Sequence, residues 1–311
     1  MCCLFGMVDY GNCFTGKQRL YILSTLAEEC EARGTDATGV AYNSGGQLRI
    51  FKRPLPAHKI RLFFPCDANV VMGHTRMATQ GSAKKNCNNH PFRGAVGGMP
   101  FALAHNGVLR NDGKLRRKLG LHDTRIETDS YIAVQLIERR KVLSFDTLSY
   151  MAEQMEGSFT FTVLDGRNSL YFIKGDNPLC LVHFPRPGFY LYASTEGILA
   201  HALKKLQIVL EKPVRVETRC GDILKIDVSG RMTTSGFDTA RLVLDSWQFP
   251  LFTGYPLPLS KTPAGHAEQE YLEELKSVAG AFGLCPEEID RLVEEGITPE
   301  EIEEYLYCGE F

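Results

Sequence analysis

The feature that most constrains the fold is an apolar run close to the amino terminus. Met1, Cys2 and Cys3 are followed by Leu4–Val8, whose sequence is LFGMV. A short apolar run of this kind predicts a buried strand, and such a strand would hold Cys2 in a fixed position. Because cysteine is small enough for the initiator methionine to be trimmed in front of it, we expect Cys2 to become the first residue of the mature protein.

An amino-terminal cysteine carries two useful groups on one carbon. Its thiol is a nucleophile, and its α-amine, with an ordinary pKa of roughly 7.7–8.0, can accept the thiol proton directly or through one water. One residue would then supply nucleophile and base, with no catalytic histidine. The short motif alone also fits an ordinary buried cysteine behind a start codon, so the choice depends on the rest of the sequence.

Composition limits the class of protein. The 311 residues are 44% hydrophobic and 23% charged, which is typical of one large globular domain or one domain with an appendage. We find neither an apolar run of membrane-spanning length nor a signal peptide. The ten cysteines are scattered without a Cys-x-x-Cys pair, which indicates reduced thiols in a cytoplasm and argues against zinc or any other metal site.

Charge is divided unevenly along the sequence. The net charge is −2, but residues 266–311 hold 14 acidic and two basic residues, a net of −12, which leaves +10 for the rest. Such an asymmetry indicates a tail that docks on the body or has a partner of its own. The basic clusters of the body come without a nucleic-acid recognition motif, so we expect no nucleic-acid partner.

Many short strands and a few helices predict two stacked sheets flanked by helices, an α+β layer architecture. We expect helices over 17–32, 145–155, 196–206, 268–282, 286–295 and 299–307, and another that opens at 127–130. We expect strands over 40–42, 48–52, 101–108, 158–164, 169–174, 179–184, 190–194 and 223–228, and one that begins at residue 70 and ends in polar residues. Polar clusters follow several of these elements, at 33–39, 73–81, 88–92, 105–107 and 127–130. Taken singly, each cluster also fits a turn, a helix cap or a surface ion pair.

Taken together, the motifs resemble the glutaminase domain of class II glutamine amidotransferases, which are N-terminal-nucleophile hydrolases. They are Met1-Cys2-x-Leu4-x-Gly6, Arg33-Gly34-x-Asp36-x-x-Gly39, Gly73-His74-Thr75-Arg76-x-Ala78-Thr79-x-Gly81, Asn89-His90-Pro91, His105-Asn106-Gly107 and Thr128-Asp129-Ser130. Their order and spacing agree over about residues 1–228, which makes the set far more specific than any one motif.

The resemblance implies an αββα sandwich of four layers and a division of the chain into three parts. The glutaminase domain would cover 1–240, a segment rich in proline and aromatic residues would follow over 241–265, and an acidic helical module would cover 266–311. The middle segment is either a strap packed on the body or a docking segment. The last is either a solvated cap or an adaptor for a basic partner.

The resemblance also implies roles for single residues. Cys2 would attack the side-chain amide of L-glutamine, and a glutamyl thioester and ammonia would form. Asn106 and Gly107 would stabilise the oxyanion, and Arg33 lies in the loop next to the nucleophile. Four further residues would bind the substrate: Arg76 the α-carboxylate, Asp129 the α-ammonium, and Thr79 and His90 as members of the substrate loops. No cofactor and no metal are implied.

The sequence departs from the family pattern near the nucleophile, without loss of a group that does chemistry. Cys3 stands where glycine is usual, so a second thiol lies beside Cys2. About 80 residues follow the glutaminase portion, which is too few for the acceptor domains common in this family. We therefore expect the ammonia-accepting synthase on a separate chain, with no membrane partner, and homo-oligomerisation is left open. Two alternatives remain: an amidohydrolase of another amide, and a non-catalytic subunit that senses glutamine.

Overall fold

The computed structural model describes residues 2–206, 212–242 and 285–295, together with the single residues 272, 276, 297 and 302. The chain divides into two compact units, Met1–Phe249 and Pro250–Phe311. Within these described ranges, no helix is both long and apolar enough to span a bilayer.

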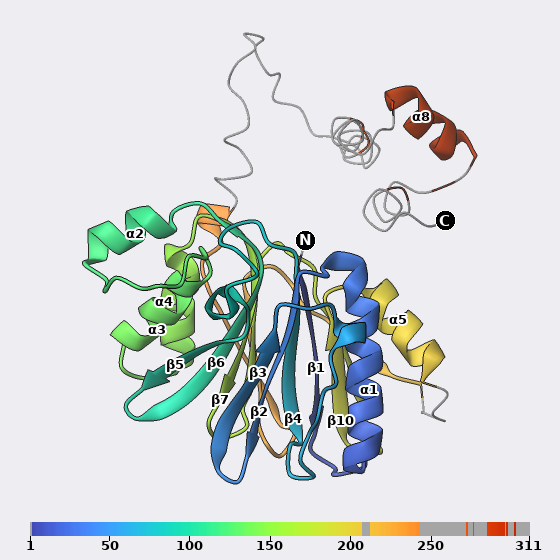
Figure 1. Ribbon diagram of the computed structural model, residues 1–311, viewed down its shortest axis with the longest axis horizontal. Helices are drawn as coiled ribbons and strands as arrows, with labels where there is room; N and C mark the ends of the chain where they lie inside the picture. The colour runs from blue at the N-terminus through green and yellow to red at the C-terminus, as the bar shows by residue number, and fades with distance from the viewer. Residues whose placement is uncertain are drawn as a thin grey trace. The chain divides into compact units, whose positions relative to one another are not determined.

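Two antiparallel sheets form the centre of the first unit (Figure 1). The seven-stranded sheet has the order β11-β9-β10-β1-β4-β2-β3, and the six-stranded sheet has the order β13-β12-β8-β7-β6-β5. The strands are β1 (Cys3–Asp9), β2 (Ala37–Ser44), β3 (Gln47–Arg53), β4 (Val70–Arg76), β5 (Phe92–Val96), β6 (Met99–Leu109), β7 (Gly157–Asp165), β8 (Leu170–Lys174), β9 (Cys180–Phe184), β10 (Phe189–Ala193), β11 (Val214–Val216), β12 (Asp222–Ile226) and β13 (Met232–Gly236).

Helices cover the outer face of each sheet. They are α1 (Gly16–Glu29), α2 (Asp112–Leu119), α3 (Tyr131–Arg139), α4 (Phe145–Gln154) and α5 (Glu196–Lys205), with short 3-10 helices η1 (Cys30–Arg33), η2 (Ala57–Lys59) and η3 (Asn86–Asn88). One apolar cluster joins α1 and α5 to the seven-stranded sheet, and a second joins α3 and α4 to the six-stranded sheet. A third cluster fills the space between the two sheets. The predicted four-layer αββα sandwich is therefore confirmed.

Alternation along the strands decides which side chains enter the layer between the sheets. On β1, Phe5 packs toward α1, whereas Leu4 and Val8 belong to the cluster between the sheets. On β6, Ala102 and Ala104 face that same inner layer. Because successive side chains of a strand point to opposite faces, residues 2 and 106 are directed into the inner layer from the two opposing sheets.

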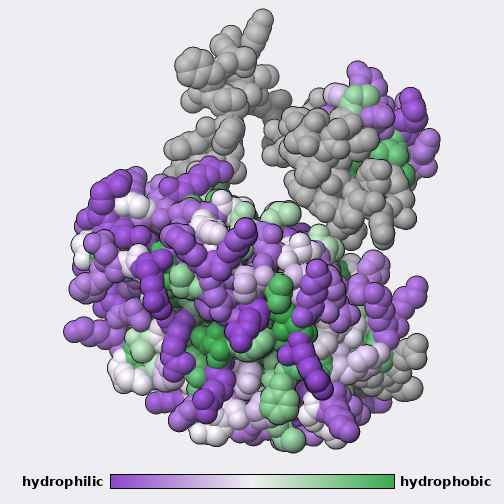
Figure 2. Space-filling model, in the orientation of Figure 1, coloured by the Kyte–Doolittle hydropathy of each residue, from purple (hydrophilic) through white to green (hydrophobic). Residues whose placement is uncertain are grey.

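β3 and β5 are edge strands of the two sheets, so the inner layer between them lies close to the surface. Figure 2 shows hydrophobic side chains gathered toward the middle of the viewed face, inside a hydrophilic rim. The guanidinium of Arg93 on β5 donates to the carbonyl of Leu48 on β3, at 3.1 Å from Nη1 to oxygen. This contact ties the two sheets together at their shared edge.

The second unit contains the described helix α8 (Pro286–Glu294), which lies where the sequence predicted a helix. Pro286 stands in its first turn, and the Glu288 carboxylate accepts a hydrogen bond from the Cys285 N–H at 2.8 Å. Ile289 and Ile302 are buried together within this unit. The helices predicted over 268–282 and 299–307, and most of the 241–265 segment, lie outside the described residues.

A buried ion pair fixes α1 against β1. The Arg19 guanidinium lies 3.0 Å from the Asp9 carboxylate, and the two side chains are 2% and 0% exposed. Asp9 also accepts hydrogen bonds from the N–H groups of Cys13 and Phe14, and Arg19 donates to the carbonyls of Phe14 and Cys66. Both charges are thus paired and hydrogen-bonded, which is the condition under which buried charges are tolerated.

We predict that Asp9→Ala lowers the free energy of unfolding by about 3–5 kcal/mol, because it leaves the Arg19 charge buried without a partner. Urea unfolding measures this loss. The control is Glu156→Ala, which removes an exposed pair with Lys114 whose side chains are 39% and 69% exposed and should cost less than about 1 kcal/mol. Equal losses in the two variants would contradict the structural role assigned to the buried pair.

Candidate active site

The predicted site residues gather at one crevice at the start of β1. It is lined by Cys2, Arg76, Met77, Thr79, Gln80, His90, His105, Gly107, Thr128, Asp129 and Ser130. The two other predicted residues adjoin it. Arg33 donates from Nε to the carbonyl of Cys2 at 3.2 Å, and Asn106 lies between His105 and Gly107 in the chain. Cys2 and Asp129, which both line this crevice, are more than 100 positions apart in the sequence.

Cys2 immediately precedes β1 and remains partly exposed. Its Sγ lies 3.4 Å from the Met77 carbonyl. Burial raises the pKa of the Cys2 thiol, while the contact with Met77 and the positive charge of Arg76 oppose that shift. Because the thiol holds its proton more tightly than usual, a nucleophilic Cys2 requires a base close by.

Asn106 has the environment expected of a ligand-binding amide. It is fully buried on β6, where its backbone pairs with Thr160 of β7. Neither its Nδ2 nor its Oδ1 has a hydrogen-bond partner. An unsatisfied buried polar group costs about 1–3 kcal/mol, so a side chain in this state is suited to a group supplied by a ligand.

Gly107 brings the backbone of β6 close to its neighbours. Its φ of +140° favours glycine, and a Cβ here would meet the Ser158 carbonyl oxygen at 2.0 Å. Glycine is therefore required for β6 and β7 to pair at this point. Gly107 itself lines the crevice, and Asn106 directly precedes it in the chain.

Arg76 ends β4 and is engaged by the loop that follows it. Its Nη1 donates to Asn89 Oδ1 at 2.7 Å, and its Nη2 donates to the carbonyls of Gln80 and Gly81 at 2.6 and 3.0 Å. The crevice has a volume of about 10 Å³, which is room for roughly one water. The crevice as it stands is therefore too small for an amino acid, and some of its lining must be displaced before one can bind.

Asp129 also lines the crevice and lies just before α3 in the chain. It is buried, and its carboxylate accepts hydrogen bonds from the Leu109 N–H at 2.6 Å and from the Ser130 hydroxyl at 3.2 Å. Arg76 and Asp129 thus carry opposite charges on the lining of one small crevice. This arrangement fits a ligand that bears both a carboxylate and an ammonium group.

Three buried histidines surround the crevice in the neutral state. Burial lowers the pKa of His74 to about 3 and lowers the pKa values of His90 and His105 as well. The ring centroids of His74 and His90 lie 4.2 Å apart, and His74 Nε2 lies 2.9 Å from the His105 carbonyl across the two sheets. Neither ring nitrogen of His90 has a partner, so His90 remains a candidate for ligand contact.

Sequence reasoning missed the contacts that hold the loops over the crevice. Asn88 donates from Nδ2 to Glu127 Oε2 at 2.8 Å, and the Glu127 N–H donates to Asn88 Oδ1 at 2.9 Å. Gln80 donates from Nε2 to the Glu127 carbonyl at 3.1 Å, and Asp36 accepts from the Ala78 N–H at 2.7 Å. These residues stood inside the motifs or the polar clusters, but nothing in their spacing indicated that they pair.

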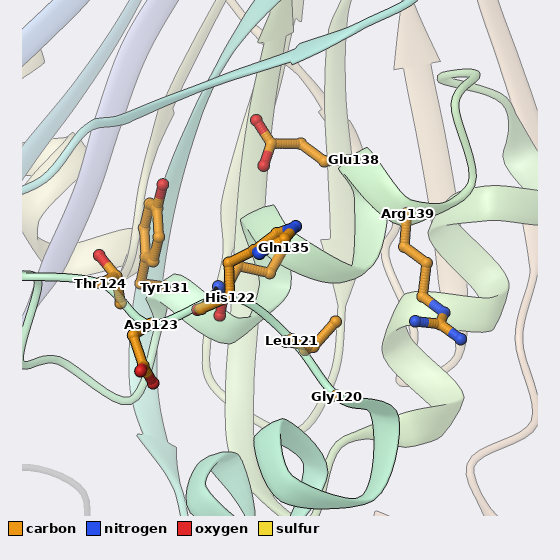
Figure 3. A pocket seen from close by; sticks show the side chains of 9 residues that line it. All are labelled: Gly120, Leu121, His122, Asp123, Thr124, Tyr131, Gln135, Glu138 and Arg139. Carbon is orange, nitrogen blue, oxygen red and sulfur yellow. Dashed lines mark hydrogen bonds between the residues drawn. The ribbon is translucent and has the colours of Figure 1, made fainter.

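A larger cavity of about 410 Å³ lies elsewhere in the first unit and is shown in Figure 3. It is lined by Gly120, Leu121, His122, Asp123, Thr124, Tyr131, Gln135, Glu138 and Arg139. None of the predicted site residues is among them, and the lining holds no thiol. Its walls therefore lack the nucleophile that the crevice supplies, although α3 begins directly after Ser130 of the crevice.

No group of three or more His, Cys, Asp or Glu side chains that could hold a metal ion occurs in the part of the chain that the structure describes.

Comparisons with known proteins agree with this geometry. A model of the family "Glutamine amidotransferases class-II" matches residues 1–187. The glutamine–fructose-6-phosphate aminotransferase (isomerizing) of Sulfurisphaera tokodaii is 28% identical over 257 residues, which cover 77% of this chain and 42% of that protein. The protein of the same name from Bacillus licheniformis is 32% identical over 185 residues, which cover 56% of this chain and 29% of that one. The chain thus spans less than half the length of these relatives.

A solved structure shares the fold. Glutamine phosphoribosylpyrophosphate (PRPP) amidotransferase from B. subtilis, in complex with ADP and GMP, superposes with a TM-score of 0.59 and 19% identity, over 76% of this chain and 49% of that one. At this identity the likeness shows the fold alone.

We predict that acid destabilises the protein through the three neutral histidines. Their folded pKa values lie below the ordinary value of about 6.5, so the unfolded chain binds protons first as the pH falls. Stability is full above pH 6.5 and is lost below it, by at most about 4 kcal/mol per pH unit for three protons. Urea unfolding at pH 7, 6 and 5 measures this slope.

In the same series, His90→Phe should reduce the slope by up to about one third. A slope that does not respond to His90→Phe would contradict the buried neutral state of that histidine.

Proposed function

The chain belongs to the class II glutamine amidotransferases, and we propose that it hydrolyses L-glutamine to glutamate and ammonia with the thiol of Cys2 as nucleophile. The observation that carries the proposal is the fully buried Asn106 amide without any partner, next in the chain to two residues that line the crevice of Cys2. A site for acyl transfer needs such an unoccupied donor where the oxyanion develops.

In the proposed mechanism, removal of Met1 frees the α-amine of Cys2, which takes the thiol proton. The thiolate attacks the carboxamide carbon, and the negative charge that develops on the amide oxygen is stabilised by the Asn106 side chain and the Gly107 N–H. Ammonia leaves with a proton returned by the amine. Water then attacks the thioester, and glutamate is released.

Substrate binding would use the two opposite charges of the crevice. Arg76 binds the α-carboxylate after the loop carbonyls of Gln80 and Gly81 withdraw, and Asp129 binds the α-ammonium. Thr79 and His90 contact the substrate from the adjoining loops. Arg33, through its bond to the Cys2 carbonyl, is a positioning residue. A site that binds both the α-carboxylate and the α-ammonium group selects a free amino acid over a peptide.

The proposal includes transfer of the ammonia to an acceptor enzyme on another chain in the cytoplasm. The names of the relatives, glutamine–fructose-6-phosphate aminotransferase and glutamine PRPP amidotransferase, each pair glutamine with an acceptor substrate. Which acceptor serves this chain depends on its partner.

The deciding assay is glutamate release from L-glutamine by the purified protein. Cys2→Ala should abolish both turnover and labelling by a glutamine-like diazoketone, whereas the neighbouring control Cys3→Ala should retain both. Binding of glutamine without any release would favour the non-catalytic sensing subunit. Faster turnover of another amide than of glutamine would favour the amidohydrolase alternative.

We predict that Arg76→Lys and Asn106→Ala differ in kinetic signature. Arg76→Lys should mainly raise KM, because lysine cannot present two coplanar donors to a carboxylate. Asn106→Ala should mainly lower kcat, by roughly 10²–10³, because its bond strengthens as the oxyanion forms. Steady-state kinetics separates the two effects.

The control for Asn106→Ala is Asn43→Ala, which removes another buried asparagine whose amide is already bonded to the Asp165 carbonyl at 2.8 Å. It should change stability and leave kcat unchanged. If the Arg76 and Asn106 variants had the same signature, the division into binding and transition-state roles would be wrong.

We also predict that deletion of residues 266–311 leaves a folded body whose glutamine hydrolysis stays within a few-fold of the full chain. Every residue of the proposed chemistry lies before position 130, and the deleted part carries the net charge of −12. Thermal melting and glutamate release check this. A truncated protein that does not fold, or is inactive, would show that the acidic segment belongs to the catalytic unit.

A further inference from the structure

Two buried thiols touch each other directly behind the candidate nucleophile. Cys3 is the first residue of β1, and Cys30 is the first residue of η1. Their sulfur atoms lie 2.9 Å apart, and both residues are 0% exposed. A disulfide bond is about 2.05 Å long, so the two sulfurs need to approach by less than about 1 Å to form one.

We propose that Cys3 and Cys30 are a reversible oxidation site, at which a small peroxide forms a disulfide that slows the hydrolysis assigned to Cys2. The formation of the disulfide rests on the geometry of the two thiols alone. Its effect on turnover rests on the proposed function.

The surroundings favour a disulfide over a shared metal. No third His, Cys, Asp or Glu joins the two thiols as a ligand set in the described part of the chain, and structural zinc takes four ligands. The pair lies in the apolar cluster between α1 and the seven-stranded sheet. Two thiols in such a place have each other as the nearest reaction partner.

The two thiols differ in their readiness to react. Burial raises the pKa of Cys30, and its contact with Cys3 adds to the rise. Burial also opposes ionisation of Cys3, but its contact with Cys30 and its hydrogen bonds with Ser194 lower its pKa. The two shifts have opposite directions, and attack by either sulfur leads to the same disulfide.

The chemistry balances with one peroxide. The Cys3 thiolate attacks an oxygen of hydrogen peroxide, the O–O bond breaks, and the departing hydroxide takes a proton to become water. The Cys30 sulfur then attacks the sulfenic sulfur of Cys3, the S–S bond forms and the S–O bond breaks, and the leaving hydroxide takes the Cys30 proton. Two thiols and one peroxide give one disulfide and two waters. A dithiol such as dithiothreitol reverses the step.

Three structural connections would transmit the effect of oxidation at this pair to the candidate active site. Cys3 follows Cys2 in the chain, and η1, which Cys30 begins, ends at Arg33, whose guanidinium holds the Cys2 carbonyl at 3.2 Å. Thr75, the residue before Arg76, donates to the Cys30 carbonyl at 2.9 Å. In Figure 1, β1 lies beside α1, whose carboxyl end leads into η1. A shift of about 1 Å at a reacting group can cost about 10² in rate.

The first experiment tests the bond itself. The full chain carrying Cys2→Ala, which removes the reactive nucleophile, is treated with hydrogen peroxide, alkylated and digested. We expect a peptide pair joined through Cys3 and Cys30, a loss of about 2 Da relative to the reduced pair, and its disappearance after dithiothreitol. Cys30→Ala in the same background is the control and should give no such pair. If the exposed thiols Cys13 and Cys66 are oxidised while Cys3 and Cys30 both remain alkylatable, the proposal is wrong.

The second experiment tests the effect on turnover. Full chain with intact Cys2 should lose at least about tenfold in glutamine turnover on oxidation and regain it with dithiothreitol, whereas Cys30→Ala should keep its rate at the same dose. Equal, reversible losses of turnover in both proteins would assign the effect to oxidation of Cys2. They would overturn the proposal that the disulfide slows hydrolysis. Absence of turnover before oxidation would contradict the proposed function, while the peptide experiment would still decide the disulfide.

Discussion

The structure depends on the burial of β1 on both faces and along both edges. This strand pairs with β10 from Phe5 to Asp9 and with β4 from Cys3 to Val8. Phe5 and Met7 pack under the helices of one layer, and Leu4 and Val8 pack against the opposite sheet. A strand held in this way cannot slide, because a shift by one residue would exchange its two faces. Residue 2 therefore has a fixed position at the end of the inner layer.

Several polar side chains at that end of the layer are not hydrogen-bonded to one another and are available to a ligand. Asn106, His90 and Thr128 are buried and have side-chain atoms without partners, while the loops above them are held by Arg76 and Glu127. Unsatisfied groups of this kind lower stability, and the clusters between the layers offset that cost. The surrounding sandwich can hold such a site because its apolar burial is extensive on both sides of each sheet.

The sequence was sufficient to predict the layers, because apolar runs located most of the strands, although not β5, β11 or β13. The proposed site residues came from the resemblance that six motifs carry, and these residues line or adjoin one crevice. Gly34 shows where local reasoning fell short. Its place after a helical segment is typical of a glycine that ends a helix in a left-handed conformation, but Gly34 is extended, and a Cβ there would meet the Arg76 carbonyl carbon at 2.5 Å. Its role is set by a strand far away in the sequence.

Contacts between distant segments could not be predicted. The reciprocal bonds of Asn88 and Glu127 join residues 39 positions apart, and the contact of Cys3 with Cys30 joins residues 27 positions apart. Neither pair has a periodicity or a motif of its own, because each depends on how strands are ordered in the sheets. The strand order places β4 between β1 and β2, which carries Arg76 to the nucleophile.

The central claim is that the α-amine of Cys2 is the base for its own thiol. The most direct test compares the rate of glutamate release with the fraction of protein that has lost Met1, measured by intact mass on the same preparations. The account predicts that the rate rises in proportion to the trimmed fraction and is absent from protein that retains Met1. Protein that retains Met1 and hydrolyses glutamine at the full rate would contradict it.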